Sequence, residues 1–253
     1  MKSFVLMAAA LLASSAHAAP FDGWTFNGNA HLIEDGATLR LAEANYQAGS
    51  AWAPTAVSVA HDFSVAFSFR IAGGTGADGL TFTVQNSAAG ALALGGNGGG
   101  LGYDGIGNSA AFIFDTWENG WDTDRAPGPN TATAIGGQLN NWGGNSIGHA
   151  YDLRDKVIYS WVDYSAANQS LMLFISDTAV KPVDAQEALW VNLPSLVGGN
   201  TAYLGFTGGT GGASDNHDIL SVQISAVPEA GAPWLLLAGA PLVLAARARR
   251  SRR

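Results

Sequence analysis

The chain has 253 residues, of which 47% are hydrophobic and only 13% are charged, with 33 glycines and no cysteine. This length supports one large domain with a substantial core, and the lack of cysteine excludes disulfides and thiol chemistry. The net charge is −8, but half of the basic residues lie in the two ends, so the body between them carries about −13. Such a body repels phosphate backbones, which excludes nucleic acid as a partner. The composition favours an all-β exported protein.

The first 18 residues have the three parts of a secretory signal peptide. Lys2 supplies the positive start, FVLMAAALLA is the apolar stretch, and Ala16-His17-Ala18 is a small-residue cleavage site. We therefore expect residues 1–18 to be removed on export and residues 19–226 to form the folded domain.

Short β-like runs, separated by turns rich in Gly, Asn, Ser and Asp, fill the middle of the chain, and no helical period lasts three turns. Many strands at this spacing predict a sandwich or jelly roll of two antiparallel sheets. The predicted strands are 37–42, 63–71, 80–85, 110–116, 131–139, 157–164, 171–176, 202–206 and 218–226.

A cluster of hard oxygen donors follows the strand predicted at 110–116, in the sequence FIFDTWENGWDTD (112–124). Calcium takes six to eight oxygens from carboxylates, amides and main-chain carbonyls, so the cluster predicts a calcium site. A solvated acidic turn is the alternative. The glycine-rich stretch GGNGGGLG (95–102) is expected to be a tight loop. It is not a phosphate loop, because it lacks the Lys-Ser/Thr ending and no helix pattern follows.

The C-terminal 227–253 segment has three parts of its own. Val227-Pro228-Glu229 precedes an apolar stretch at about 232–246 and an arginine-rich end at 247–253. The tail resembles the PEP-CTERM sorting signal of Gram-negative bacteria, although Ala230 stands where the motif has its second proline. The resemblance implies processing by an exosortase, transient anchoring in the inner membrane through a short helix, and a destination in the cell envelope, surface or extracellular matrix. A plain membrane anchor is the alternative.

Seven sequence motifs follow one another through the middle of the chain, and they are LRLAEANYQAGSAW (39–52), FSVAFSFRI (63–71), ADGLTFTVQN (77–86), GGNGGGLGY (95–103), NSAAFIFDTWENGWD (108–122), IYSWVDY (158–164) and YLGFTGGTGGASDNHDILSVQI (203–224). Their order resembles the L-type, or legume-like, lectin domain in its bacterial form. The resemblance implies a concanavalin-like jelly roll, with loops at one end that hold calcium and sugar.

By this resemblance, Asp78 is the carboxylate that accepts hydrogen bonds from sugar hydroxyls, and it follows a cis peptide bond. Gly99, or Gly100 if the loop shifts by one residue, donates a main-chain N–H to the same sugar. In the family a variable loop near the C-terminus of the domain sets specificity through main-chain N–H groups, and here it matches Gly211, Gly212 and Ala213.

The resemblance also implies that Asp115, the Trp117 carbonyl and Asn119 bind calcium, with Asn119 also donating to the sugar. Asp122 or Asp124 is the fourth ligand. The Trp117 ring is expected to offer the sugar an apolar face.

Legume lectins have a second, transition-metal site that uses a Glu two residues before the calcium Asp and a downstream His. Here Ile113 occupies the first position and no His occupies the second, so calcium alone is expected.

Three sets of residues have alternative readings. His149 and Asp152 have the spacing of a sugar-and-calcium pair found in cargo lectins, although a polar loop is favoured. His217 is expected to be structural rather than a ligand. Tryptophans are expected in the core or at sandwich edges, and these are Trp24, Trp52, Trp142, Trp161 and Trp190.

Hydrolases of the same fold need two carboxylates, which the laminarinase-like enzymes carry as E-x-D-x-x-E on one strand. In this chain Asp115 and Glu118 are present, but Ile113 stands at the nucleophile position. We therefore expect calcium-dependent, non-catalytic binding of glycans or exopolysaccharide. The alternative is a structural matrix protein of exopolysaccharide or biofilm without specific sugar binding, and a hydrolase is a third, weaker reading.

Overall fold

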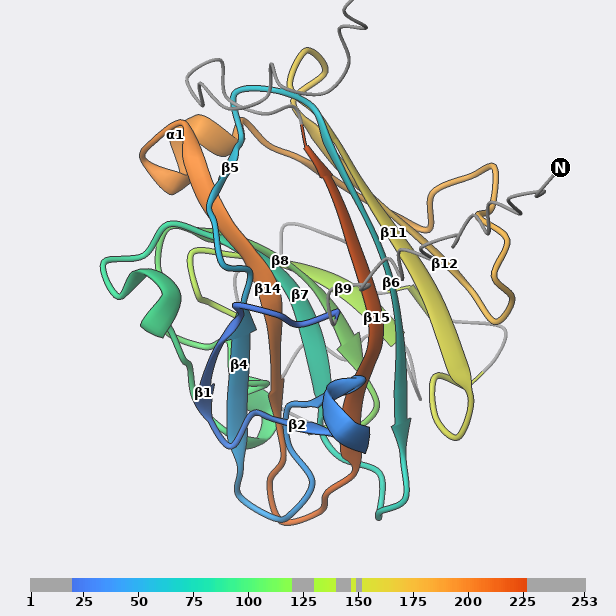
Figure 1. Cartoon of the computed structure of the whole chain (residues 1–253). Coiled ribbons are helices and arrows are strands. Elements are labelled where there is room, and N and C mark those ends of the chain that lie inside the picture. The colour runs from blue at the N-terminus through green and yellow to red at the C-terminus, as the bar shows by residue number, and fades with distance from the viewer. Residues whose placement is uncertain (1–19, 120–129, 140–146, 149–151, 227–253) are drawn as a thin grey trace, which may run out of the picture.

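The computed structural model describes residues 20–119, 130–139, 147–148 and 152–226. These residues form two antiparallel sheets packed face to face, so the predicted all-β, jelly-roll class is confirmed (Figure 1). The predicted signal peptide and the C-terminal tail lie outside the described residues. Within those residues, no helix is long and apolar enough to cross a bilayer.

The first sheet has eight strands, and β5 (Val57–Ser58) joins it through β14 alone. The other strands, in spatial order, are β1 (Thr25–Gly28), β4 (Ala48–Trp52), β14 (Thr201–Gly209), β7 (Gly79–Gln85), β8 (Ser109–Asp115), β9 (Asn130–Ile135) and β10 (Ile147–Gly148).

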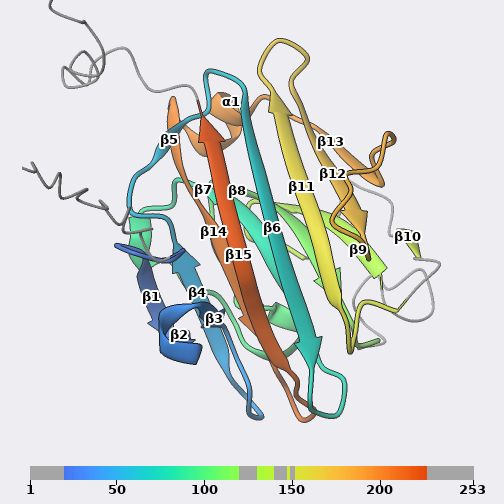
Figure 2. The same ribbon diagram turned by 45° about the vertical axis from the view of Figure 1, so that its right-hand side comes forward.

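The second sheet has seven strands and faces the viewer in Figure 2. Its strands, in spatial order, are β13 (Glu187–Trp190), β12 (Ser170–Ser176), β11 (Val157–Ser165), β6 (Phe63–Ala72), β15 (Asn216–Ala226), β3 (Thr38–Arg40) and β2 (His31–Ile33). Four short helical turns complete the described elements: η1 (Glu34–Gly36), η2 (Gly90–Leu92), η3 (Gly98–Gly100) and α1 (Leu193–Val197).

All nine predicted strands overlap an observed strand, while β1, β2, β4, β5, β10 and β13 were not predicted. The run predicted at 131–139 is longer than β9. That strand ends at Ile135 because Gly136 and Gly137 follow it with φ of 67° and 71°, a turn conformation that glycine adopts readily.

The main core lies between the two sheets and is rich in phenylalanine. Phe67 of β6 meets Phe206 of β14 with ring centroids 5.0 Å apart, and Phe69 meets Phe114 of β8 at 4.7 Å. Offset and edge contacts of this kind contribute stability beyond the apolar area they bury. These rings therefore help to fix how β6 of one sheet lies against β14 and β8 of the other.

A second apolar cluster covers the other face of the eight-stranded sheet. Ile113 of β8 alternates with Phe112 and Phe114, so its side chain points away from the main core. It packs in a buried cluster with Trp52, Leu101 and other residues of the chain that leads to and from η3. Strand β8 is consequently buried along its whole length on both faces.

The expectation that every tryptophan is a core or edge residue is wrong for Trp161. Trp52 is fully buried, and Trp190 lies on the edge strand β13. Trp161, by contrast, is partly exposed on β11, an inner strand of the seven-stranded sheet, and its side chain faces away from the other sheet. Trp142 lies outside the described residues.

Candidate functional site

Loops that join strands at one end of the sandwich, the lower end in Figure 1, gather around Asp78. Asp78 immediately precedes β7, and the Ala77–Asp78 peptide bond is cis, as the resemblance implies. Its N–H donates to the Gly209 carbonyl at 3.1 Å, and its carbonyl accepts the Thr116 N–H at 3.0 Å. The main chain of Asp78 is thus tied to the end of β14 on one side and to the end of β8 on the other.

Two glycines lie beside the Asp78 carboxylate. A Cβ atom placed on Gly211 would lie 3.2 Å from Asp78 Oδ2, and one on Gly98 would lie 4.0 Å from it. The Gly98 N–H donates to the Thr210 carbonyl at 2.9 Å, which joins the two glycine loops. Because neither position carries a side chain, the main chain of both loops comes close to the carboxylate, and Asp78 is 3% exposed.

The main-chain N–H groups that were predicted to contact a sugar differ in their surroundings. Gly99 follows Gly98 within η3 and therefore lies near Asp78. The contact of its N–H with a sugar stays a prediction. The Gly211 N–H donates within its own loop, to the Ala213 carbonyl at 3.1 Å. In this structure the Gly211 N–H is engaged within the loop, and its contact with a sugar stays a prediction. Gly212 is exposed next in the same loop.

A chain of buried threonine hydroxyls holds the glycine-rich loop against the sheet. Thr81 Oγ1 lies 2.7 Å from Thr83 Oγ1 and 2.8 Å from Thr207 Oγ1, and Thr207 donates to the Leu101 carbonyl at 2.7 Å. A Cβ on Gly102 would meet the Gly208 carbonyl at 2.7 Å, so only glycine allows this close approach. The loop that carries Gly98 and Gly99 is thereby fixed over the end of β14.

The predicted metal ligands form a compact turn at the end of β8. Asp115 is 3% exposed and pairs with Gly79, next to Asp78. Its Oδ1 accepts the Trp117 N–H at 2.9 Å, and Asn119 Nδ2 lies 3.5 Å from the Trp117 carbonyl oxygen. One carboxylate, one main-chain carbonyl and one amide are brought together here.

These three groups fit the oxygen chemistry that calcium prefers. The two candidates for the fourth ligand, Asp122 and Asp124, lie outside the described residues. In the segments that the structure does describe, no group of three or more acidic or histidine side chains is gathered closely enough to hold a metal ion. A complete site would therefore need the 120–129 segment.

Two exposed aromatic rings belong to the same end of the molecule. Trp117 is 41% exposed, and its ring lies 3.5 Å from a Cβ placed on Gly76. Tyr46 is 71% exposed; its N–H donates to the Gly211 carbonyl, and its hydroxyl lies 3.5 Å from a Cβ placed on Gly212. The sequence indicated Trp117 but not Tyr46, whose proximity depends on a pairing of distant loops.

A buried ion pair supports the two loops on which the site depends. Asp215 is fully buried and accepts Arg154 Nε at 2.7 Å, Arg154 Nη2 at 3.2 Å and the Gly74 N–H at 2.6 Å. Its pairing with Asp215 raises the pKa of Arg154. Gly74 lies in the loop that leads to Asp78, and Asp215 follows the loop that contains Gly211. Sequence reasoning missed this clamp.

The structure bears on two possible ligand roles, that of the pair His149 and Asp152 and that of His217. Asp152 is exposed and its Oδ1 accepts the Arg154 N–H at 2.9 Å, while His149 lies outside the described residues. His217 is fully buried, and burial lowers its pKa to about 4. Neither of its ring nitrogens has a hydrogen-bond partner among the described residues. A side chain so placed cannot reach a ligand at the surface, which agrees with the structural role expected for His217.

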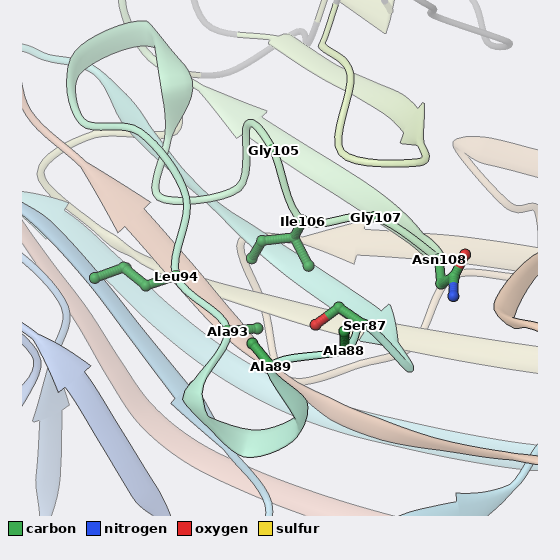
Figure 3. A pocket seen from close by; sticks show the side chains of 9 residues that line it. All are labelled: Ser87, Ala88, Ala89, Ala93, Leu94, Gly105, Ile106, Gly107 and Asn108. Atoms are coloured by element: carbon green, nitrogen blue, oxygen red, sulfur yellow. The ribbon is translucent and has the colours of Figure 1, made fainter.

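A cavity of about 360 Å³ lies elsewhere, at the opposite end of β7 and β8 (Figure 3). Ala88, Ala93, Leu94 and Ile106 are among its lining residues, and none of its lining side chains is charged. Strand β7 runs seven residues from Gly79 to Gln85, which corresponds to about 20 Å. The cavity is therefore separate from Asp78 and from the cluster of oxygen donors.

Solved structures similar to this chain include plant lectins. Lectin II from Ulex europaeus is 19% identical, with 82% of this chain and 94% of that chain covered and a TM-score of 0.66. A Lotus tetragonolobus seed lectin is 17% identical, with 81% and 94% covered and a TM-score of 0.68. The lectin from Bauhinia forficata in complex with GalNAc is 19% identical, with 81% and 93% covered and a TM-score of 0.66. At these identities the likeness shows the fold.

The model of the legume lectin domain matches residues 20–233, which is most of the chain. That match agrees with the fold of two antiparallel sheets. The chain therefore belongs to the legume lectin family, whose members are carbohydrate-binding, non-catalytic proteins.

Proposed function

We propose that this protein binds carbohydrate in a calcium-dependent, non-catalytic manner through the loops around Asp78. The observation that carries the proposal is the position of the Asp78 carboxylate. It is held by main-chain bonds to β14 and β8, lies beside Gly98 and Gly211, and is adjacent through β pairing to the Asp115 turn.

The chemistry of these groups suits a sugar. A carboxylate can accept hydrogen bonds from two hydroxyl groups, and the exposed rings of Trp117 and Tyr46 can cover the C–H face of a pyranose. Asn119 and the Gly99 N–H would donate to ring substituents. Because the rings of Trp117 and Tyr46 are exposed at the surface, we expect single-site affinity between about millimolar and micromolar, roughly −4 to −8 kcal/mol. Useful avidity would then require multivalent display.

Asp115, the Trp117 carbonyl and Asn119 would hold the calcium ion, together with Asp122 or Asp124. The bound ion would supply positive charge that neutralises Asp115 and keeps the turn closed. The Asp115–Trp117 hydrogen bond already sets the direction of this turn. Ordering the turn places Asn119 and the Trp117 ring on the side of Asp78, which is how metal would favour sugar binding.

Absence of catalysis is supported by the surroundings of Ile113. Its side chain occupies the position that would need a nucleophilic carboxylate, and it is fully buried in an apolar cluster under the glycine-rich loop. A glycosidic bond could not reach this position. We propose carbohydrate as the class of ligand and no particular sugar. The Bauhinia forficata lectin structure contains GalNAc, but this chain differs from that lectin at about four residues in five.

The test is a glycan array with the full chain, run with calcium and with a chelator. Asp78→Asn keeps the size of the side chain but removes the charge, and Asp177→Asn on the exposed surface is the matched control. We expect chelation and Asp78→Asn each to abolish binding, and Asp177→Asn to leave it unchanged. Glycan binding that survives both treatments would refute the proposal.

We further propose that the protein is exported and acts at the cell surface or in an extracellular matrix, with an exosortase processing its tail. The two ends of the sequence support this, through the signal peptide at 1–18 and the three-part tail at 227–253. Intact-mass measurement of the protein from its own cells tests it. A mature chain that still begins at Met1 would contradict export by this signal.

A further inference from the structure

A trough runs along the outer face of the seven-stranded sheet, away from the Asp78 end of the molecule. On β11 the side chains alternate between buried and partly exposed, and Tyr159, Trp161 and Asp163 face outward. Trp161 is paired with Phe174 on β12 and with Ala66 on β6. A row of large side chains on β11 therefore stands beside a row of small ones on β6.

The floor and the second wall follow from the register of the strands. On β6 the outward positions next to Tyr159, Trp161 and Asp163 are Ser68, Ala66 and Ser64. On β15, Ser221, Gln223 and Ser225 lie opposite those same three small residues. Figure 2 shows β15, β6, β11 and β12 side by side on this face. The small residues of β6 thus form a floor between β11 and β15.

Two cavities of about 200 and 320 Å³ follow one another along this floor, and a third of about 300 Å³ adjoins them at Ser64 and Asp163, where it turns toward Ser170 and Met172 of β12. The first two share Ala66, Trp161 and Gln223, and the second and third share Ser64 and Asp163. From Tyr159 to Ser165 the trough extends over six residue steps of β11, which is about 20 Å. This length suits an extended chain of several sugar rings better than a single one.

The charge of the trough indicates whether a neutral or an anionic polymer fits it better. Asp163 forms an ion pair with Lys181, whose Nζ also lies 4.1 Å from the centre of the Phe174 ring. Asp62 is the third charged residue among those lining the cavities, which leaves one net negative charge. Together with the acidic body of the chain, this disfavours anionic polymers. The remaining lining side chains are hydroxyls, the two amides of Gln223 and Asn168, aromatic rings and small or aliphatic groups.

We propose that this trough is a second carbohydrate-binding surface that takes an extended, neutral polysaccharide chain. The Trp161 and Tyr159 rings contact the C–H faces of successive sugars, while Gln223 and the serines of β6 and β15 bond to hydroxyl groups. The trough and Asp78 are on different parts of the sandwich and share no residue. The inference therefore holds whether or not the loops around Asp78 bind a sugar.

The test uses affinity gel electrophoresis of the full chain in gels that contain galactomannan, xyloglucan, barley β-glucan or dextran. Alginate serves as the anionic comparison. All variants are made in the Asp78→Asn background and run with chelator, which removes the contribution of the loop site. Trp161→Ala deletes the central ring, and Ala66→Tyr fills the floor without removing any ring. Leu92→Ala, at an exposed apolar residue on the eight-stranded side, is the matched control.

We expect at least one neutral polysaccharide to retard the Asp78→Asn protein, and alginate not to. Trp161→Ala and Ala66→Tyr should each weaken that binding about tenfold or more, because truncation or blockage of a central aromatic contact has this effect. Leu92→Ala should not change it. Near-ultraviolet circular dichroism verifies that each variant is folded.

Three results would overturn the proposal. The first is absence of retardation by all four neutral polymers. The second is equal binding by folded Trp161→Ala and Ala66→Tyr proteins. The third is a concentration-dependent dimer, seen by light scattering, that Trp161→Ala dissociates, because the trough would then be covered by a second copy of the chain.

Discussion

Replacing Arg154 with glutamine should destabilise the protein and loosen the site at once. The change removes two hydrogen bonds to Asp215, which is fully buried and would keep only the Gly74 N–H. Breaking a buried pair by deleting one partner costs about 3–5 kcal/mol. The Arg154 side chain is 24% exposed, so water compensates part of this loss. We therefore expect a decrease in the free energy of unfolding of about 2–3 kcal/mol.

Urea unfolding of the wild-type and variant chains measures this decrease as a lower midpoint at an unchanged m-value. The matched control is Lys181→Gln, which breaks the pair with Asp163, where both side chains are more than a third exposed. An exposed pair of this kind contributes at most about 1 kcal/mol. Arg154→Lys keeps the charge but loses the bidentate hydrogen bonding, so its free energy of unfolding should lie between those of the wild type and Arg154→Gln.

The same variant has a functional consequence, because Asp215 and Gly74 belong to the loops on either side of the site. Glycan binding by Arg154→Gln should weaken even at low temperature, where the chain remains folded. The reasoning would be refuted if Arg154→Gln and Lys181→Gln lowered the unfolding free energy equally. It would also fail if folded Arg154→Gln bound glycans as tightly as the wild type.

Three further predictions concern single buried or crowded positions. Gly211→Ala places a Cβ 3.2 Å from Asp78 Oδ2, so glycan titration should show binding at least about tenfold weaker, with the melting temperature nearly unchanged. His217 stays neutral in the folded chain down to about pH 4, whereas in the unfolded chain it takes up a proton near pH 6.5. The free energy of unfolding should therefore fall by roughly 3 kcal/mol as the pH decreases from 6.5 to 4, and His217→Leu should reduce this dependence on pH. Burial raises the pKa of Glu187 to about 8, so stability should decline as pH rises from about 4.5 to 8, and urea unfolding at pH 8 should show Glu187→Gln to be about 4 kcal/mol more stable.

The strands that the sequence predicts are those whose residues carry a β signal of their own. Phe63–Ala72 and Val157–Ser165 are rich in aromatic and β-branched residues. Strand β4 has the sequence AGSAW, and its strand character comes from pairing with β1 and β14 on either side. Short strands of small residues are stabilised by their neighbours, so local patterns do not indicate them.

The site divides in the same way. Asp115, Trp117 and Asn119 are close in sequence, so their meeting could be predicted from one stretch of chain. Asp78 could be indicated only through the resemblance, since an aspartate between alanine and glycine is an ordinary turn. Arg154 and Asp215 are separated by 61 positions, and their pairing results from the way β6, β11 and β15 lie together.

The outward direction of Trp161 could not be read from the sequence for a different reason. In IYSWVDY (158–164) both alternating sets contain apolar residues, Ile158 and Val162 on one side and Tyr159 and Trp161 on the other. Either set could face the core. Pairing with the phenylalanines of β6 decides the question, because Phe67 and Phe69 face the other sheet and carry Ile158 with them.

The distribution of buried faces bears on where a long glycan could lie. A polymer could cross the outer face of a sheet, but the glycine-rich loop and its apolar cluster cover the outer face of the eight-stranded sheet over Ile113 and Trp52. Strands β7 and β8 are buried on both sides as a result. Within the described residues, the loops at Asp78 and the outer face of the seven-stranded sheet therefore remain open to sugars. The loops at Asp78 suit the end or a branch of a glycan, and the outer face of the seven-stranded sheet suits an extended stretch of its chain. A protein that uses both surfaces would hold a branched polymer at two points, and Asp78→Asn and Trp161→Ala would reduce its affinity independently.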